Sequence, residues 1–267
     1  MHLSCPFCRL PLHRHEASGG AYCDKKHHFD RAPEGYLDLI PGKHPPSEGE
    51  SRALMRSRRH WLEQGALNPL ADALAALLPA ERGELIVLGA GEGYLCRALA
   101  ARRSDWHYAG IERARNAVFA AAKAQPEAMF VLADPKQAPL QAGSAMALLR
   151  EVDNKTKLTE LPTLLAPGGL LILISQGPRH HWQLRSHINP DAKEHPPLWP
   201  KLDELENRVQ QRCHFEVTLD RSERELMLAI SPLAWRASNQ SRHDYLQEGE
   251  PRLEHDYLIS LWQRAKD

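Results

Sequence analysis

The stretch ELIVLGAGEGYL, residues 84–95, passes from a run of apolar residues to a turn that contains Gly89, Gly91 and Gly93. A short apolar run that ends in glycines is typical of a buried strand, and CRALAARR after it has the pattern of a helix. Glycine lets the backbone approach a ligand, and the N-terminus of a helix favours a negatively charged group. The stretch therefore predicts a strand, a glycine turn and a helix that together form one end of a ligand site.

The same alternation of strands and helices continues along the chain. Apolar segments at strand spacing follow at HYAGIER (107–113), AMFVLAD (128–134), SAMALLRE (144–151) and LLILISQG (170–177), and CHFEVTLD (213–220) and HDYLISLWQR (255–264) add two candidates. Residues 54–78 have helical spacing, with a break at Pro69. Strands that alternate with helices predict an α/β protein whose doubly wound, Rossmann-like parallel sheet is covered on both faces.

Two acids stand at the ends of successive predicted strands. Glu112 closes the second strand, where a carboxylate can accept hydrogen bonds from a ribose diol. Asp134 closes the third strand, where it can accept a hydrogen bond from the exocyclic amine of adenine. Either acid alone is typical of a solvated loop, but together with the glycine turn they favour an adenosine-containing cofactor at the carboxyl edge of the sheet.

The N-terminal residues contain three of the five cysteines of the chain. Cys5 and Cys8 form a CxxC pair, and Cys23 and His27 follow it as a CxxxH pair. Two close pairs of sulfur and nitrogen ligands are typical of tetrahedral, structural zinc, and zinc would supply folding energy that so short a segment lacks. From spacing alone three other histidines compete for the fourth position, namely His28, His13 and His15.

Composition sets the organisation and the compartment that we expect. The chain has 267 residues, 42% of them hydrophobic, and 34 basic residues balance 34 acidic ones, so a polyanion must be bound by local patches. We expect a zinc-binding domain over residues 1–40, a linker over 41–60 and a catalytic domain over 61–267. No apolar run is long enough to cross a bilayer and the N-terminus does not resemble a secretory signal, which predicts a cytoplasmic protein without a membrane partner.

These motifs resemble the class I S-adenosylmethionine-dependent methyltransferases, and more closely the 23S ribosomal RNA guanine-N1 methyltransferases of the RlmA family. The resemblance covers nearly the whole chain, and the zinc segment is its most specific part, since ordinary class I enzymes lack one. It is carried by CPFC, CDKKHHFDRAPEGYLDLI, SRRHWL, GAGEGY, PGG, GPRHHWQL and SPLAWRA.

The resemblance implies the site residues as well as the activity. It assigns zinc to Cys5, Cys8, Cys23 and His27, and it assigns cofactor contacts to the turn around Gly91 and Glu92, to Leu67 and to His180. It also implies methylation of guanine N1 in a hairpin loop of 23S ribosomal RNA, and a homodimer.

The sequence departs from the family pattern at two places that matter for activity. Val87 stands where relatives carry an acid that helps to hold the amino group of the cofactor, and Ala90 is a milder change in the turn. REVDNKTK (150–157) replaces a less acidic segment that contains tyrosine and proline, in the region expected to line the target base. A divergent target or weakened catalysis are both compatible with these changes.

Guanine N1 carries a proton, so a methyltransferase acting there needs a group that accepts it. Glu151 and Asp153 follow the fourth predicted strand and are the candidates for this general base.

Two segments combine cations with an indole in the manner of RNA-binding surfaces, RSRRHW (56–61) and PRHHWQLRSH (178–187). Two other functions compete with the methyltransferase: a zinc-stabilised RNA-binding protein that retains an inactive or weakly active fold, and a nicotinamide-dependent oxidoreductase that uses the same turn.

Overall fold

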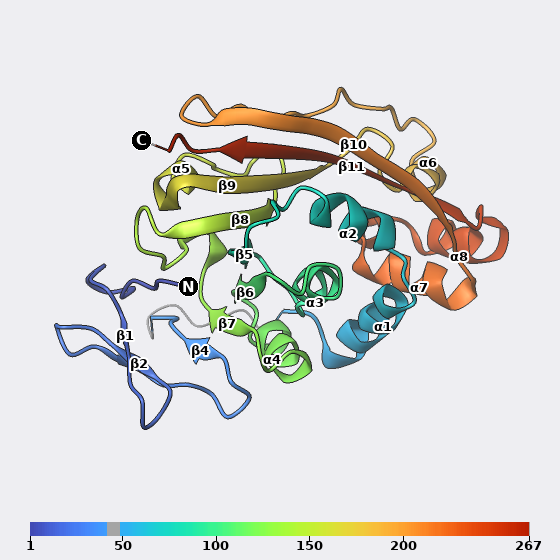
Figure 1. Ribbon diagram of the computed structural model, residues 1–267. Helices are drawn as coiled ribbons and strands as arrows, with labels where there is room; N and C mark the ends of the chain where they lie inside the picture. The colour runs from blue at the N-terminus through green and yellow to red at the C-terminus, as the bar shows by residue number, and fades with distance from the viewer. Residues whose placement is uncertain (42–48, 267) are drawn as a thin grey trace.

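The computed structural model describes residues 1–41 and 49–266 of the chain. Its centre is an eight-stranded sheet with the order β10-β11-β9-β8-β5-β6-β7-β4, visible edge on in Figure 1. The strands are β4 (Leu37–Asp38), β5 (Glu84–Leu88), β6 (His107–Glu112), β7 (Met129–Leu132), β8 (Ala145–Glu151), β9 (Leu165–Gln176), β10 (Glu206–Thr218) and β11 (Arg252–Gln263). All strands from β4 to β9 pair in parallel, as expected, whereas β11 is antiparallel to both β9 and β10.

The order of the strands creates the position for a ligand. The chain runs from β5 to β6 to β7 in one direction across the sheet and then returns to place β8 on the other side of β5. At such a switch point the loops after neighbouring strands diverge, which leaves a crevice at the carboxyl ends of the strands. The glycine turn, Glu112 and Glu151 follow β5, β6 and β8 and so lie around this crevice.

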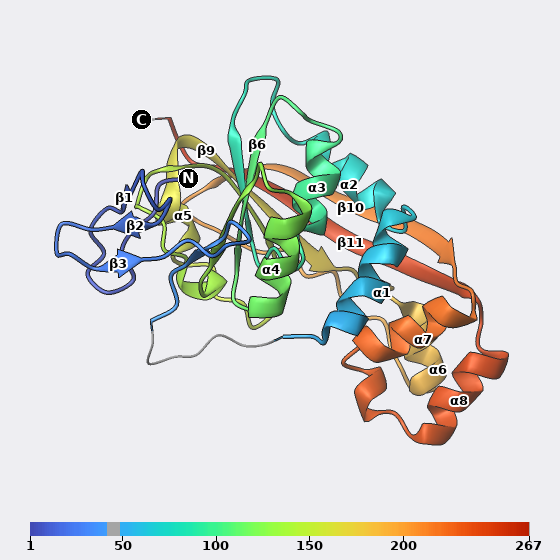
Figure 2. The ribbon, with the colours of Figure 1, turned by 90° about the horizontal axis from the view of Figure 1, so that it is seen from below.

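The helices cover the sheet and build a separate group beside it. They are α1 (Arg52–Glu63), α2 (Asn68–Ala75), α3 (Tyr94–Ala100), α4 (Arg115–Ala124), α5 (Leu161–Leu164), α6 (Trp182–Ile188), α7 (Arg221–Ile230) and α8 (Asn239–Glu248), with 3-10 turns at Pro135–Gln137 and Ala234–Arg236. Sequence signals set several ends: Ser51 caps α1, Pro69 lies in the first turn of α2, and Asp220 with Glu223 forms a capping box on α7. Figure 2 shows α1, α6, α7 and α8 together at one end of the molecule.

The N-terminal segment forms a small antiparallel sheet of β1 (His13–Arg14), β2 (Ala21–Tyr22) and β3 (His28–Phe29). It is packed against the large sheet, because Leu3, Phe29 and Leu39 share one apolar core with β5, β6 and β8. The strand β4 directly after it joins the large sheet at the edge of β7. The first 40 residues therefore cover one face of the sheet, while α2, α3 and α4 pack on the other face.

Part of the expected linker is helical. Residues 41–60 were expected to connect the two domains, but α1 begins at Arg52. Ser51 caps this helix, and Met55 and Trp61 on it are buried, so the second half of the segment belongs to the packed molecule. Residues 42–48 of the expected linker lie outside the described residues.

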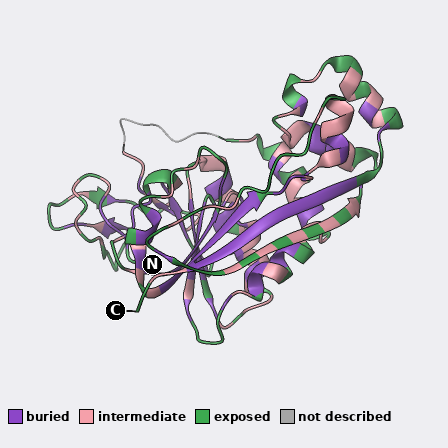
Figure 3. Cartoon of the chain, turned by 90° about the horizontal axis from the view of Figure 1, so that it is seen from above, coloured by how far each residue is buried: buried purple, intermediate pink, exposed green. Residues whose placement is uncertain are grey.

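The two C-terminal strands are longer than their sequence patterns suggest. Residues of β11 are buried almost throughout, whereas those of the edge strand β10 alternate between exposed and half-buried (Figure 3). The alternation is expected of a strand with one face on the core and one toward solvent. Over residues 1–41 and 49–266, no helix is both long and apolar enough to span a membrane.

Candidate cofactor, metal and acceptor sites

The expected zinc ligands lie together in the N-terminal module. One ligand atom from each of Cys5, Cys8, Cys23 and His27 lies within 4.8 Å of all the others. The Sγ atoms of Cys8 and Cys23 are 3.6 Å apart, and the His27 Nδ1 lies 3.4 Å from the Cys5 Sγ and 3.3 Å from the Cys23 Sγ. Zinc–sulfur bonds of about 2.3 Å imply tetrahedron edges of roughly 3.5–3.8 Å, so the donor set fits zinc in both chemistry and spacing.

The competing histidines of this segment do not join the cluster. His13 contacts the Asp24 carboxylate, His15 contacts Ser18, and His28 is exposed on β3. Burial opposes ionisation of the Cys23 thiol, but hydrogen bonds from the backbone at His27 and from the neighbouring ligands outweigh it and lower its pKa to about 6. A thiol that ionises readily is the form that binds a metal ion.

The three glycines of the turn have different surroundings. Gly89 and Gly91 have φ angles of +86° and +55°, and a Cβ atom placed on either would meet nothing within 4 Å. Gly93 has a φ of +85°, but there a Cβ atom would lie 3.0 Å from that of Ala121 and 3.2 Å from the Phe130 ring. The first two glycines therefore present open backbone to the crevice, and the third one permits close packing of α3.

Glu112 is positioned by the backbone around it. Its Oε2 accepts a hydrogen bond from the Gly91 amide at 2.9 Å, and its Oε1 accepts bonds of 2.7 Å from the amides of Arg113 and Ala114. The carboxylate thus joins the end of β6 to the glycine turn and is held rigidly beside the open backbone. This fits an adenosyl ligand, because a half-buried carboxylate with fixed orientation can still accept bonds from two ribose hydroxyls.

Asp134 lies farther along the same edge. Its Oδ1 caps the 3-10 turn by accepting a bond of 2.9 Å from the Lys136 amide, and its Oδ2 lies 3.9 Å from the Arg113 guanidinium. Its second oxygen has no close ion pair, since 3.9 Å at an exposed surface is a weak interaction. Contact of Glu112 and Asp134 with a cofactor stays a prediction.

The side chain of Glu92 points away from the open turn. It is buried, and it forms ion pairs with Arg97 of α3 at 2.9 Å and with Arg59 of α1 at 2.6 Å. Its carboxylate therefore ties α1 to the glycine turn, and any contact with a cofactor must come from its backbone. Val87, which replaces the acid of relatives, is buried in the core under the sheet edge.

A cavity of about 580 Å³ opens beside the carboxyl ends of β8 and β9. Leu67 and His180, two of the expected cofactor contacts, both line it, and so does Glu151. Its other walls come from α1, α6, α7 and β11 and include Arg58, Trp61, Gln176, His181, His255 and Tyr257. The volume is in the range of sites for small organic ligands and exceeds what one nucleobase needs.

Glu151 and Asp153 differ in their suitability as a proton acceptor. Glu151 is the last residue of β8 and is exposed where this cavity meets a second one of about 850 Å³. Its carboxyl contacts Gln176, and the protein atoms around it hinder hydration of the charged form, which raises its pKa. Asp153 accepts bonds from the Thr156 hydroxyl at 2.6 Å and the Lys155 amide at 3.1 Å, which lower its pKa. We favour Glu151 as the proton acceptor, because it faces the cavity beside Trp61 and Gln176, while Asp153 is engaged in its own loop, and because a raised pKa makes a carboxylate a stronger base.

The cations and tryptophans of the two segments with an RNA-binding pattern have different partners in the structure. In RSRRHW, Arg58 pairs with Glu50, Arg59 pairs with Glu92, and Trp61 is buried in the cavity wall. In PRHHWQLRSH, Trp182 lies between two guanidinium groups, those of Arg179 and Arg185, at 5.1 and 5.5 Å. Most of these cations hold the fold together and are not a free basic patch.

Sequence reasoning missed the residues that β11 and the end of β9 bring to the cavity. Gln176, His255 and Tyr257 line it, yet none of them stands in a motif with recognisable spacing. His181 was only part of a basic segment. The HH doublet at 180–181 was the one local signal, and its partner His255 lies on a distant strand that packs beside it.

Comparison with known proteins agrees with this geometry. Residues 3–48 match the family model described as RlmA, N-terminal, a zinc ribbon. The chain is 25% identical over 245 residues to the 23S rRNA (guanine(748)-N(1))-methyltransferase of Streptomyces fradiae, which covers 88% of this chain and 86% of the relative. It is also 25% identical over 252 residues to YxjB of Bacillus subtilis, provisionally named for guanine-N1 methylation of 23S rRNA, with 87% and 86% covered.

Over most of its length this chain is therefore similar to 23S rRNA guanine-N1 methyltransferases. Its first module is a zinc ribbon of the RlmA type, and its strand order is that of class I methyltransferases with β4 added at one edge. The solved structure of the [4+2]-cyclase SpnF superposes with a TM-score of 0.50 at 18% identity and covers 84% of this chain and 88% of its own. That neighbour shows the fold alone, since one fold can carry different reactions.

Proposed function

We propose that this protein transfers a methyl group from S-adenosylmethionine to N1 of a guanine in a hairpin loop of 23S ribosomal RNA. The proposal is carried by one observation: the open backbone at Gly89 and Gly91, with Glu112 fixed beside it, lies at the same sheet edge as the cavity that holds Glu151. A cofactor site and an acceptor site thus adjoin, as group transfer requires. The names of the relatives supply the acceptor.

The residues present give each part of the cofactor a place. Gly89 and Gly91 would receive its methionine end, Glu112 its ribose and Asp134 its adenine amine. Backbone amides of the turn and of Glu92 are the remaining polar contacts that we expect there. When bound, the cofactor supplies an electrophilic methyl group on a sulfonium, so the protein has mainly to orient the acceptor.

The acceptor needs its N1 proton removed and its base taken out of any pair or stack. We propose Glu151 as the group that accepts the proton, with Gln176 holding its carboxylate in place. Trp61 in the cavity wall offers a ring face to an extruded base, and Arg58 is the nearest cation of α1 that lines the cavity. A base in a hairpin loop reaches such a cavity without breaking a duplex.

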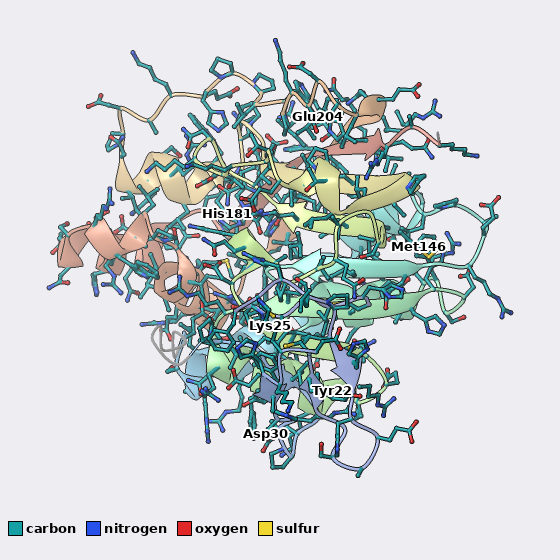
Figure 4. The ribbon with its side chains drawn as sticks, turned by 90° about the vertical axis from the view of Figure 1, so that its left-hand side faces the viewer. Tyr22, Lys25, Asp30, Met146, His181 and Glu204 are labelled. Carbon is teal, nitrogen blue, oxygen red and sulfur yellow. The ribbon has the colours of Figure 1, made fainter. Side chains whose placement is uncertain are left out.

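The zinc ribbon is the second contact that we propose for RNA. Arg9, Arg14, Lys25 and Lys26 are exposed on it, and Phe7 has 56% of its surface exposed. Figure 4 labels Tyr22, Lys25 and Asp30 on this module, in the lower part of the view, and His181 above them. Exposed cations beside an exposed ring suit phosphates and unstacked bases.

Incubation of the full chain with labelled S-adenosylmethionine and 23S rRNA that lacks the modification tests the proposal. We expect label on one guanine of a hairpin loop. Because a methyl group on N1 prevents base pairing, primer extension should stop at this guanine. Label on another position would refute the assigned atom. Bound cofactor without any transfer would refute the activity.

One observation favours a second function, that of a zinc-stabilised RNA-binding protein with an inactive fold. Val87 is apolar and buried where relatives carry an acid, and Glu112 already accepts bonds from three backbone amides. In that case calorimetry should detect no binding of S-adenosylmethionine while the RNA still binds. Affinity in the micromolar range for the cofactor would rule this function out.

Two further expectations belong with the proposal. Ribosomal RNA as substrate places the protein in the cytoplasm, and the resemblance implies a homodimer. Both stay predictions. Light scattering of the purified chain at several concentrations measures whether it forms a homodimer.

A further inference from the structure

The wall of the acceptor cavity holds a second cluster of metal-ligand type; the family resemblance assigns only His180 of it, as a cofactor contact, and no motif assigns a metal there. It consists of His180, His181 and His255, whose nearest ring nitrogens all lie within 4.8 Å of one another. The first two come from the turn before α6, and the third comes from β11. We propose that these three imidazoles bind one divalent ion of the zinc class, separate from the zinc of the ribbon.

Unpartnered nitrogens point to a missing ligand in this cluster. The Nε2 atoms of His181 and His255 are both buried and have no hydrogen-bond partner. His255 has only 2% of its surface exposed, so its nitrogen is not satisfied by bulk water. A buried polar atom without a partner is destabilising, and a metal ion would remove that penalty for both rings at once.

The third ring is held in the orientation that metal ligands require. The Nδ1 of His180 lies 3.1 Å from the carbonyl oxygen of Asp256 and 3.3 Å from its amide nitrogen, so this ring atom already faces the β11 backbone. In the tautomer that carries its proton on Nδ1, this proton is donated to the carbonyl and the lone pair is left on Nε2, which is the usual arrangement of a metal-binding histidine. The ligand atom of His180 is therefore its Nε2.

One movement is needed to bring the three nitrogens onto a single ion. The rings of His180 and His181 are stacked with centroids 4.0 Å apart, and a metal lies near the plane of each imidazole that binds it. The ring of His181 must therefore turn out of the stack. It loses no hydrogen bond of its Nε2 when it turns, because that atom has none. Its backbone stays fixed through the amide, which donates to the Glu254 carbonyl at 2.8 Å.

The carboxylates that neighbour His255 on β11 are not available to the ion. Asp256 is neutralised by Arg212 at 2.7 Å, and Glu254 is neutralised by Arg179. Glu151 lines the same cavity, but we assign it to the proton transfer and not to the ion. Three imidazoles with one position left for water are typical of zinc, cobalt and nickel sites that remain open to a ligand.

Metal content of the full chain tests the inference without reference to methyl transfer. After equilibration with a small excess of Zn²⁺ and gel filtration, we expect two ions per wild-type chain. His181→Leu and His255→Leu should each hold one, that of the ribbon. His195→Ala changes an exposed histidine of the neighbouring cavity and should keep two.

Cobalt spectroscopy keeps the test decisive if a variant folds poorly. With the ribbon already filled by Zn²⁺, one equivalent of Co²⁺ should give visible d–d bands without the near-ultraviolet thiolate band of a cysteine site. Far-ultraviolet circular dichroism and the melting temperature report whether each variant is folded. Wild-type protein that holds a single ion, or a folded His181→Leu variant with the wild-type cobalt spectrum, would overturn the inference.

Discussion

At the scale of single residues, Glu112 has the most constrained position in the cofactor site. Three backbone amides fix its carboxylate beside the open turn. We expect Glu112→Gln to weaken binding of S-adenosylmethionine roughly 10–100-fold, because a charged acceptor contributes about 1.5–3 kcal/mol to its hydrogen bonds. Calorimetry measures the change, with Glu127→Gln on the exposed surface as the matched control. Equal affinity of the Glu112 variant and wild type would contradict the assignment.

Glu151 is the residue on which the chemical step depends in our proposal. Glu151→Gln keeps the size of the side chain and removes the proton acceptor, so we expect the turnover rate to fall about 10²–10⁴-fold. Binding of cofactor and RNA should change little. Asp153→Asn makes the same chemical change at a carboxylate that caps its own loop and serves as the control. Its turnover rate should stay within a few-fold of the wild-type rate. The opposite ranking of the two variants would assign the base to Asp153.

The acidity of Glu151 also predicts the pH dependence of the reaction. The protein atoms around Glu151 hinder hydration of its charged form and raise the pKa of this carboxyl above its ordinary value of 4.5. The residue acts as a base only when ionised, so the rate should rise with pH through this raised pKa and then level off. Single-turnover rates from acid to neutral pH measure this limb. The residual activity of Glu151→Gln should not show this rise of the rate with pH.

At the scale of elements, the ion pairs of Glu92 connect α1 to the glycine turn and α3. Arg59 and Arg97 both contact its buried carboxylate and are themselves partly exposed. We expect Glu92→Gln to lower the free energy of unfolding by about 1–3 kcal/mol, since two guanidinium groups lose their acceptor but can still be hydrated. Urea denaturation measures this loss. Glu225→Gln removes the exposed pair with Arg221 and should change stability by less than about 0.5 kcal/mol.

Some strands and pairings of the fold could be predicted from local sequence patterns, and others could not. The glycine turn, both acids and the two ligand pairs of the ribbon are local patterns. The structure places the turn after β5, Glu112 at the end of β6 and the ligand pairs together, whereas Asp134 lies two residues beyond β7 and caps the 3-10 turn. The length of β10 and β11 and the antiparallel pairing of β11 with β9 were not visible locally, because they depend on contacts between distant segments. Since β11 carries His255 and Tyr257, these two residues of the cavity wall were hidden with it.

At the scale of the whole molecule, the zinc ribbon and the large sheet are parts of one packed structure. Leu3 and Phe29 are buried in a core that includes β5 and β8, and the isolated bridge of Leu3 with Leu140 joins the two parts. β4 extends the sheet beyond β7. The ribbon therefore stabilises the large sheet, in addition to the contact with RNA that we propose for it.

Removal of residues 1–40 tests this dependence. The truncated chain would expose one apolar face of the sheet and the edge of β7, so we expect a melting temperature several degrees lower and a tendency to aggregate. Scanning calorimetry and light scattering measure both effects. A truncated chain as stable as the full one would show that the ribbon is an independent domain.

The sequence by itself determined the alternation of strands and helices in the large sheet, the glycine turn with its acids and the three cysteine ligands of the ribbon, while the choice of His27 over the other histidines rested on the family resemblance. These features follow from residue spacing along a few turns or strands, where periodicity and ligand geometry act directly. Only the tertiary structure decided which residues share the acceptor cavity. His180 contacts the backbone of Asp256, which lies 76 residues farther along the chain. This contact exists because burial of apolar strand faces pairs β11 with β9, and no local sequence pattern encodes that pairing.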